Sequence, residues 1–366
     1  MKLTLQLRLL PTVEQADALR ATMERFNAAA SFAANVGFEA GAFSQPSIHK
    51  LCYRELRDRF GLSAQMAVRA IGKAVEAFRT LHAQGRRVRP TFKALGAVTY
   101  DERILGFKGP DKVSLWVLGG RTILAMVYGA YQGERFDRIK GQCDLVHRDG
   151  AFYLYATVDL PEPPPVPVED FLGVDLGIVQ LATDSDGNAY TGADVEKVRR
   201  RHHRNRQRLQ RKGTKGAKKR LRKLSGREAR FRRHENHRIS KAVVALAKDT
   251  GRGLALEDLT HIRSRTTVRR RDRARHSGWA FRQLRAFLTY KAALAGVPAV
   301  AVDPRDTSRT CNACGHCERA NRKSQARFEC RQCGYSANAD LNAALNLRVR
   351  GLGCRKPPPE LAGLSA

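Results

Sequence analysis

Four cysteines near the end of this 366-residue chain have the spacing of a metal site. They form two Cys-x-x-Cys pairs separated by 15 residues, and they are Cys311, Cys314, Cys330 and Cys333. Each pair presents two thiolates on one side of a tight turn, so the two pairs predict a tetrahedral structural Zn²⁺ site. Gly315 and Gly334 follow the pairs and suit the positive φ that such turns often need. His316 and Cys317 are competing ligands beside the first pair, and this prediction leaves both out.

Three acidic residues stand where a carboxylate is unusual. Asp175 lies inside the apolar segment Phe171–Ile178, and Glu257 lies near the end of the apolar segment Gly253–Leu259. Asp340 follows the second cysteine pair, where the spacing of alanine, leucine and asparagine predicts the start of a helix. Structural alternatives remain open, because Asp175 could be a buried acid with a hydrogen-bonding partner and Asp340 could be a helix cap. Brought together, the three carboxylates would repel each other unless hard cations bound them.

One long segment, residues 196–238, carries positive charge almost exclusively. It holds 20 Lys or Arg residues against 3 Asp or Glu residues. Solvated helix faces usually mix both signs, so this segment favours a track for nucleic-acid phosphates. Its sparse apolar residues predict long helices with one thin buried edge, paired around the turn Gly213–Gly216. The candidate phosphate contacts are Arg204, Arg208, Arg211, Lys218, Arg222 and Lys223.

The charge of the whole chain points to the same class of partner. A formal net charge of +32, from 67 Lys and Arg against 35 Asp and Glu, repels itself unless a polyanion neutralises it. Nucleic acid is the expected partner, bound first through its phosphates. Basic residues near loops of the first half could contact phosphate or simply be solvated; these are Arg86, Arg87, Arg89, Lys93 and Lys108.

A membrane partner is not expected. The sequence has no run of 18 apolar residues, and its first residues are too short and too interrupted for a signal peptide. The cysteines outside the two pairs show no disulfide pattern, which indicates a reducing cytoplasm. A hydrophobic fraction of 42% suffices to build folded cores, and the length suggests two or three domains.

The first half of the chain predicts a β-barrel with an inserted helical bundle. Alternating leucines over residues 3–9 predict a strand, and Thr12–Gln15 resembles a capping box that begins a helix. Further helices are expected over His49–Phe60 and Ala64–Leu81. Short β-like runs then continue to Leu160: Ala97–Tyr100, Lys112–Val117, Thr122–Val127, Asp137–Val146 and Phe152–Val158. We expect a barrel from residues 1–10 and 85–160, a bundle at 11–84, and a Pro-rich linker at 161–168.

The second half follows the plan of an RNase H-like α/β domain. Three strands up to Thr191 come first, and a helical region, the strand ending near Glu257, the helix Trp279–Ala295 and the strand Val297–Val302 follow. In that fold, carboxylates from the first strand, the fourth strand and a late helix converge. Two Mg²⁺ ions held there could activate water and stabilise a leaving 3′-oxygen, which is phosphodiester hydrolysis. We expect a basic mobile loop at Arg263–Arg275 and a disordered tail at 351–366.

Motifs distributed along the chain resemble the OrfB/TnpB family of insertion-sequence proteins, the compact relatives of type V CRISPR effectors. They are Phe171–Gly177, Leu254–Leu259, Thr307–Gly315, Arg327–Gly334 and the sequence Asp-Leu-Asn-Ala-Ala that begins at Asp340. The resemblance implies an RNA-guided DNA endonuclease encoded by a transposable element. It also implies a wedge-like barrel and a recognition-like bundle that grip guide RNA and target DNA, and a RuvC-like nuclease domain at residues 169–306 and 335–350. A zinc ribbon at 307–334 would help to load the target strand.

The resemblance assigns Asp175, Glu257 and Asp340 to the family's acidic triad. The family often has Asp-Arg-Asp before Asn-Ala-Ala, whereas this chain has Asn338-Ala339-Asp340. The last aspartate is kept, so cutting is expected. Two alternatives stay open: a non-cutting regulator that binds DNA or RNA through the same surfaces, and a conventional transposase or resolvase of RNase H type. The latter would not explain the bundle and barrel ahead of the nuclease domain.

Overall fold

A computed structural model describes residues 1–259, 281–324 and 326–354 of the chain. The chain divides into two compact units, Met1–Pro161 and Glu162–Ala366. The boundary falls in the Pro-rich stretch that the sequence singled out. The expected basic loop at Arg263–Arg275 lies within residues 260–280, outside the described residues.

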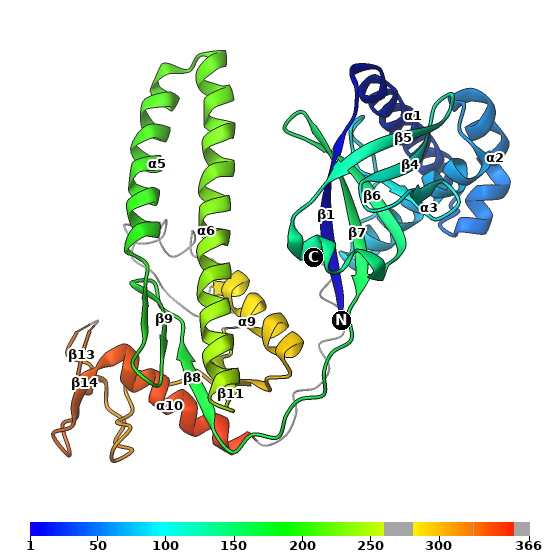
Figure 1. The fold of residues 1–366 in the computed structure, drawn as a ribbon. Helices are drawn as coiled ribbons and strands as arrows, with labels where there is room; N and C mark the ends of the chain where they lie inside the picture. The colour runs from blue at the N-terminus through cyan, green and yellow to red at the C-terminus, as the bar shows by residue number, and fades with distance from the viewer. Residues whose placement is uncertain (260–280, 325, 355–366) are drawn as a thin grey trace. The chain divides into compact units, whose positions relative to one another are not determined.

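The first unit is built on a nearly closed antiparallel sheet (Figure 1). Its strand order is β2-β6-β7-β1-β5-β4-β3. The strands are β1 (Lys2–Leu10), β2 (Val98–Tyr100), β3 (Leu105–Phe107), β4 (Lys112–Val117), β5 (Gly120–Val127), β6 (Ile139–Arg148) and β7 (Ala151–Asp159). Leu5, Leu7 and Leu9 are buried while their neighbours in β1 are exposed, as strand alternation requires. As expected, β1 joins the strands that follow residue 85, in a sheet that is nearly closed; strand β3 was missed.

Three helices are inserted between β1 and β2: α1 (Val13–Glu39), α2 (Gln45–Phe60) and α3 (Ala64–Ala83). Thr12 begins α1 with the predicted capping box, and Ser63 caps α3. Helix α2 begins four residues earlier than expected, because Ser44 caps it and a proline occupies its first turn. Its end at Gly61, with φ of 64°, agrees with the prediction. A short helix, α4 (Ala130–Gly133), completes the unit.

The second unit contains a five-stranded sheet with the order β10-β9-β8-β11-β12. Its strands are β8 (Phe171–Asp175), β9 (Gln180–Asp184), β10 (Ala189–Thr191), β11 (Gly253–Glu257) and β12 (Ala299–Val302). The first three strands run antiparallel, and β11 and β12 continue the sheet in parallel with β8. Strands expected from separate parts of the sequence thus lie side by side, with β11 directly beside β8.

Helices cover both faces of this sheet (Figure 1). They are α6 (Lys215–Asp249), α9 (Phe281–Ala295) and α10 (Ala339–Gly353); a further helix, α5 (Ala193–Lys212), packs on α6. The apolar end of α6 and helix α9 pack on the face formed by Leu172, Val174 and Leu254. Helix α10 packs on the opposite face, where Leu347 meets Phe171 and Ala255. Because helices cover both faces of the sheet, side chains on both sides of these strands are buried. This explains why the strand sequences are continuous apolar runs.

The basic segment forms a helical hairpin of α5 and α6 (Figure 1). Gly213 ends α5 with φ of 64°, and the Thr214 side chain caps α6. Helix α6 continues past residue 238, where the basic segment ends, through an apolar stretch that includes the buried Ile239, Val243 and Val244. None of the helices within the described ranges is long and apolar enough to cross a membrane.

One expectation about the end of the chain was wrong. Residues 351–353, placed in a disordered tail, form the last turn of α10. The reason is packing: Gly351 is buried so closely that a Cβ there would lie 2.7 Å from the Ala255 Cβ. The rest of the expected tail, from residue 355, lies outside the described residues.

Candidate functional site

Asp175 and Glu257 end the adjacent parallel strands β8 and β11. Val174 pairs with Leu256, so the two acids that follow lie next to each other at the same edge of the sheet. A hydrogen bond joins their carboxyl groups. Burial and the nearby Asp340 charge raise the pKa of Asp175 to about 6. Burial and Asp175 raise the pKa of Glu257 well above its usual range, so the pair retains a proton more readily than isolated carboxylates would.

Asp340 approaches from the first turn of α10. The predicted alternative, that Asp340 caps this helix, is wrong: Asn338 is the cap, and its Oδ1 accepts from the N–H groups of Asp340 (2.9 Å) and Leu341 (3.2 Å). The Asp340 side chain is therefore free of capping, although the residue is only 7% exposed. Burial raises the pKa of its carboxyl, and Arg322 opposes this effect.

Helix α10 lies in direct backbone contact with the sheet, and this contact fixes the place of Asp340. A Cβ on Gly173 in β8 would lie 2.0 Å from the Ala344 carbonyl oxygen and 2.5 Å from the Arg348 nitrogen. No side chain fits there. At the start of β8, Asp170 accepts two hydrogen bonds from Arg348, at 2.8 and 2.7 Å. Glycine and the ion pair together hold α10 against β8.

Arg322 is a site residue that the sequence reasoning missed. Its Nη2 lies 3.4 Å from Asp340 Oδ1. A cation from the cysteine-containing segment, residues 307–334, thus contacts an acid at the start of α10. The sequence contains many arginines, and nothing near Arg322 distinguished it from the others as a site residue. Only the fold brings the two residues together.

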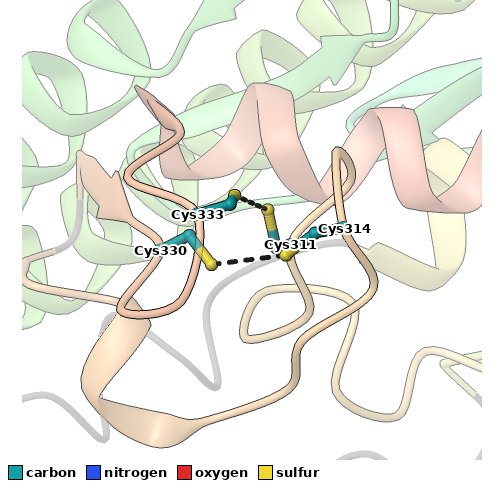
Figure 2. Close-up of side chains that lie close together, drawn as sticks. All are labelled: Cys311, Cys314, Cys330 and Cys333. Carbon is teal, nitrogen blue, oxygen red and sulfur yellow. Dashed lines mark hydrogen bonds between the residues drawn. The ribbon is translucent and has the colours of Figure 1, made fainter.

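The side chains of Cys311, Cys314, Cys330 and Cys333 lie close together (Figure 2). Within the described residues, their four sulfurs are the one group of three or more potential metal ligands that all lie within 4.8 Å of each other. Cys311 Sγ lies 3.7 Å from Cys333 Sγ, and Cys314 Sγ lies 3.6 Å from Cys330 Sγ. A set of four converging thiols fits Zn²⁺, which thiolates bind tetrahedrally.

The turns around the cysteines have the conformation that the glycines predicted. Gly315 and Gly334 have φ of 77° and 74°, and each donates its N–H to the carbonyl of the first cysteine of its pair. Main-chain amides also hydrogen-bond to the sulfurs of Cys311 and Cys330. His316 lies 3.4 Å from Glu318, and neither it nor the exposed Cys317 joins the cluster.

All six predicted phosphate contacts are exposed on the α5–α6 hairpin: Arg204, Arg208, Arg211, Lys218, Arg222 and Lys223. None of them forms an ion pair among the described residues. The three acids of residues 196–238 are paired with other arginines, and Glu235 binds Arg238. Glu196 binds Arg199 and Arg200, and buried Glu228 binds Arg206 between the two helices. The exposed charge of the hairpin is therefore almost wholly positive.

Two family models match the second half of the chain. Residues 153–262 match the family described as "Probable transposase" (OrfB_IS605), and residues 281–347 match "Cas12f1-like, TNB domain". The second match contains the whole cysteine cluster and Asp340.

Curated relatives agree with these matches. The chain is 31% identical over 265 residues to "CRISPR-associated endodeoxyribonuclease Cas12f1" of Sulfoacidibacillus thermotolerans, covering 65% of this chain and 59% of that protein. It is 29% identical over 222 residues to "Putative RNA-guided DNA endonuclease InsQ" of Escherichia coli, covering 55% and 54%. "TnpB-like protein MJ0751" of Methanocaldococcus jannaschii is 32% identical over 123 residues, covering 33% and 44%. The chain thus spans at most 59% of the length of these relatives.

A solved structure shows the same fold. The protein in "Cryo-EM structure of the Cas12f1-sgRNA-target DNA complex" matches with a TM-score of 0.66 at 14% identity, over 92% of this chain and 83% of that one. The resemblance to the OrfB/TnpB family is confirmed, and the chain is a relative of the OrfB/TnpB and Cas12f proteins with a Cas12f-like α+β structure.

Proposed function

We propose that this chain is an RNA-guided DNA endonuclease encoded by a transposable element. The observation that carries the proposal is the meeting of Asp175, Glu257 and Asp340 from two strands and a helix, with the pKa of each acid raised by burial. Raised carboxyl pKa values in a cluster are typical of functional sites. Relatives named as RNA-guided or CRISPR-associated endonucleases support the same activity.

The proposal assigns a part to each domain. Residues 169–306 and 335–350 are the RuvC-like nuclease domain, and the strand order of the second sheet supports an RNase H-like plan. Residues 307–334 are a zinc ribbon. The barrel (1–10 and 85–160) and the bundle (11–84), joined to the nuclease domain by the linker 161–168, grip guide RNA and target DNA. The protein acts in the cytoplasm, on DNA of the nucleoid.

The acidic cluster provides oxygen ligands for hard cations such as Mg²⁺. The three carboxylates would hold two such cations, which would supply activation of a water and stabilisation of the leaving 3′-oxygen of a phosphodiester. Asp175, Glu257 and Asp340 would provide the carboxylate oxygens, and because burial raises the pKa of Asp175 and Glu257, any proton that either retains would have to leave before both could act as ligands. Without bound cations, Arg322 offsets part of the negative charge of Asp340.

The α5–α6 hairpin is the proposed backbone track. Its unpaired arginines and lysines suit phosphates of any sequence, whereas the choice of target is delegated to base pairing with the guide RNA. This division explains how a strongly basic protein reaches specific sites.

The partner is tested by expressing the chain together with its native flanking DNA. We expect a discrete RNA to co-purify, and a change of its guide end to redirect cutting to a new matching site. Equal cutting of the chosen site after RNase treatment and complete removal of RNA would show that the protein is not RNA-guided. Guide-directed binding without cutting at any Mg²⁺ concentration would favour the non-cutting regulator.

A further inference from the structure

Three asparagines repeat every four residues along α10, at Asn338, Asn342 and Asn346. This spacing places them on one face of the helix. Asn338 caps the helix, but Asn342 is 0% exposed and Asn346 is 8% exposed. Buried amides inside a helix are costly unless their hydrogen bonds are satisfied, so their partners indicate what this face is for.

Both buried amides bind the main chain that leads into the first cysteine pair. Asn342 Nδ2 donates to the Thr310 carbonyl at 2.8 Å, and its Oδ1 accepts from the Asn312 N–H at 3.1 Å. One turn later, Asn346 Nδ2 donates to the carbonyls of Thr307 and Thr310, both at 2.8 Å. The backbone on each side of Cys311 is therefore held by side chains of α10.

The cysteine-containing segment is itself tied together around this point. Asn321 is fully buried and donates to the carbonyls of Arg309 and His316, on either side of the first pair. Its Oδ1 accepts from the N–H of Arg331, inside the second pair. A metal bound by the four sulfurs would thus fix the same peptide groups that Asn342 and Asn346 bind.

Helix α10 is consequently held from two sides. Gly173 and Asp170 fix it against the sheet, and the two asparagines fix it against the cysteine-containing segment. Their hydrogen bonds also set its register, because a shift of one helical turn would leave the buried amides of Asn342 and Asn346 without their carbonyl partners. Asp340 lies in the first turn of this helix, two residues before Asn342.

We propose that Asn342 and Asn346 are positioning residues that couple the metal-bound cysteine cluster to Asp340. The proposal rests on the proposed function for the role of Asp340. When the cysteines hold their metal, the Thr307–Asn312 backbone is rigid, and the two amides transmit that rigidity to the first turns of α10. When the metal is lost, these hydrogen bonds weaken and Asp340 is no longer held beside Asp175 and Glu257.

The coupling is tested without relying on catalysis. Hydrogen exchange over residues 339–347 is measured in zinc-loaded protein and after treatment with the zinc-selective chelator TPEN. In the native protein, we expect zinc removal to accelerate exchange there. In the double variant Asn342→Ala/Asn346→Ala, exchange should already be fast with zinc bound, and chelation should add little, because the two perturbations act on one connection.

Milder and control variants keep the test decisive if the double variant folds poorly. Asn342→Asp retains the acceptor for the Asn312 N–H but cannot donate to Thr310, so we expect partial acceleration with normal zinc content. Val349→Ala removes an exposed apolar side chain from the same helix, and its exchange should respond to zinc as the native protein does. Equal exchange over 339–347 with and without zinc in the native protein, or a full zinc response in the double variant, would overturn the proposal.

Cleavage provides a separate second readout. Asn346→Ala should lower the cleavage rate about tenfold or more and raise the Mg²⁺ concentration needed for half-maximal cutting, as for other residues that orient metal ligands. Guide-directed DNA binding should be retained. If the native protein never cuts, the proposed function fails but the zinc-dependent exchange still decides the coupling. If the native protein cuts and Asn346→Ala cuts at the same rate and Mg²⁺ requirement, the coupling is contradicted and the function stands.

Discussion

The cysteine cluster and the acidic cluster of the second unit are built in opposite ways. Each cysteine pair lies within one short turn, closed by a glycine and by main-chain amides, and the sulfurs reach within 4.8 Å of each other. The acids come from β8, β11 and α10, and their meeting depends on strand pairing and on a helix packed against Gly173. The first cluster is a product of local sequence, and the second is a product of the whole domain.

The chemistry of the two clusters differs accordingly. Four converging thiols leave no open position around a tetrahedral metal, which is the mark of a structural site. In the wider acidic cluster, burial raises the pKa of all three carboxyl groups and Arg322 contacts Asp340; we propose that this cluster binds cations and substrate. Under the proposed function, the compact site serves stability and the wider site serves reaction.

The largest effect should come from breaking the compact site. Cys330→Ser removes one of four zinc ligands, and structural zinc in small domains contributes on the order of 10 kcal/mol to folding. We expect loss of bound zinc and local unfolding of residues 307–334, with the first unit still folded. Metal analysis and hydrogen exchange check this result. An exposed control, Cys317→Ser, should keep its zinc; carefully purified native protein without zinc would contradict the assignment.

A smaller effect should come from the pH dependence of the acidic cluster. The folded-state pKa of Asp175 is raised to about 6 from 3.8, so its protonated form stabilises the fold below about pH 4. That contribution is lost as pH rises toward 6. In EDTA at pH 7.5, Asp175→Asn should therefore be more stable than the native protein, by about 1–3 kcal/mol, with the gain vanishing at low pH. Calorimetry at several pH values provides the measurement.

Asp186→Asn is the matched control for that experiment. Asp186 is ion-paired with Arg252, which lowers the pKa of its carboxyl, so its neutralisation should reduce stability at pH 7.5. If Asp175→Asn also lost stability at pH 7.5, Asp175 would be a buried structural acid.

The smallest effect should come from the hairpin. Replacing Arg204, Arg208 and Arg211 with glutamine should weaken nucleic-acid binding and reduce the slope of log affinity against log salt, by up to about one per lost phosphate contact. Arg200→Gln is the control, because Arg200 lies on the same helix but is paired with Glu196. Binding titrations over a range of salt concentrations compare the two. An unchanged slope in the triple variant would mean that this face is only solvated.

Features set by local sequence could be predicted, whereas features set by tertiary packing could not. Local signals were sufficient for β1, for the capping box at Thr12 and for the cysteine turns, because the residues that specify each are close in sequence. The acids were selected from the order of the elements and from the family resemblance. The short strand β3 and the early start of α2 were missed, since a strand of three residues and a serine cap give weak patterns.

Contacts between distant segments were beyond prediction from a single sequence. Nothing local indicates that Arg322 reaches Asp340, or that α10 lies so close to β8 that only glycine fits at position 173. The asparagines of α10 were visible as a repeat, but their partners at Thr307 and Thr310 depend on the tertiary structure. Tertiary packing decided each of these features.

The central claim is that Asp175, Glu257 and Asp340 form one catalytic site, and it is tested by replacing each with alanine and measuring DNA cleavage beside guide-directed DNA binding. Loss of one carboxylate should abolish detectable cutting in each variant, while binding and the melting temperature in EDTA stay close to native values or rise slightly. Cutting at the native rate in any one variant would remove that residue from the site. Loss of folding in place of chemistry would contradict the account and make the residue structural.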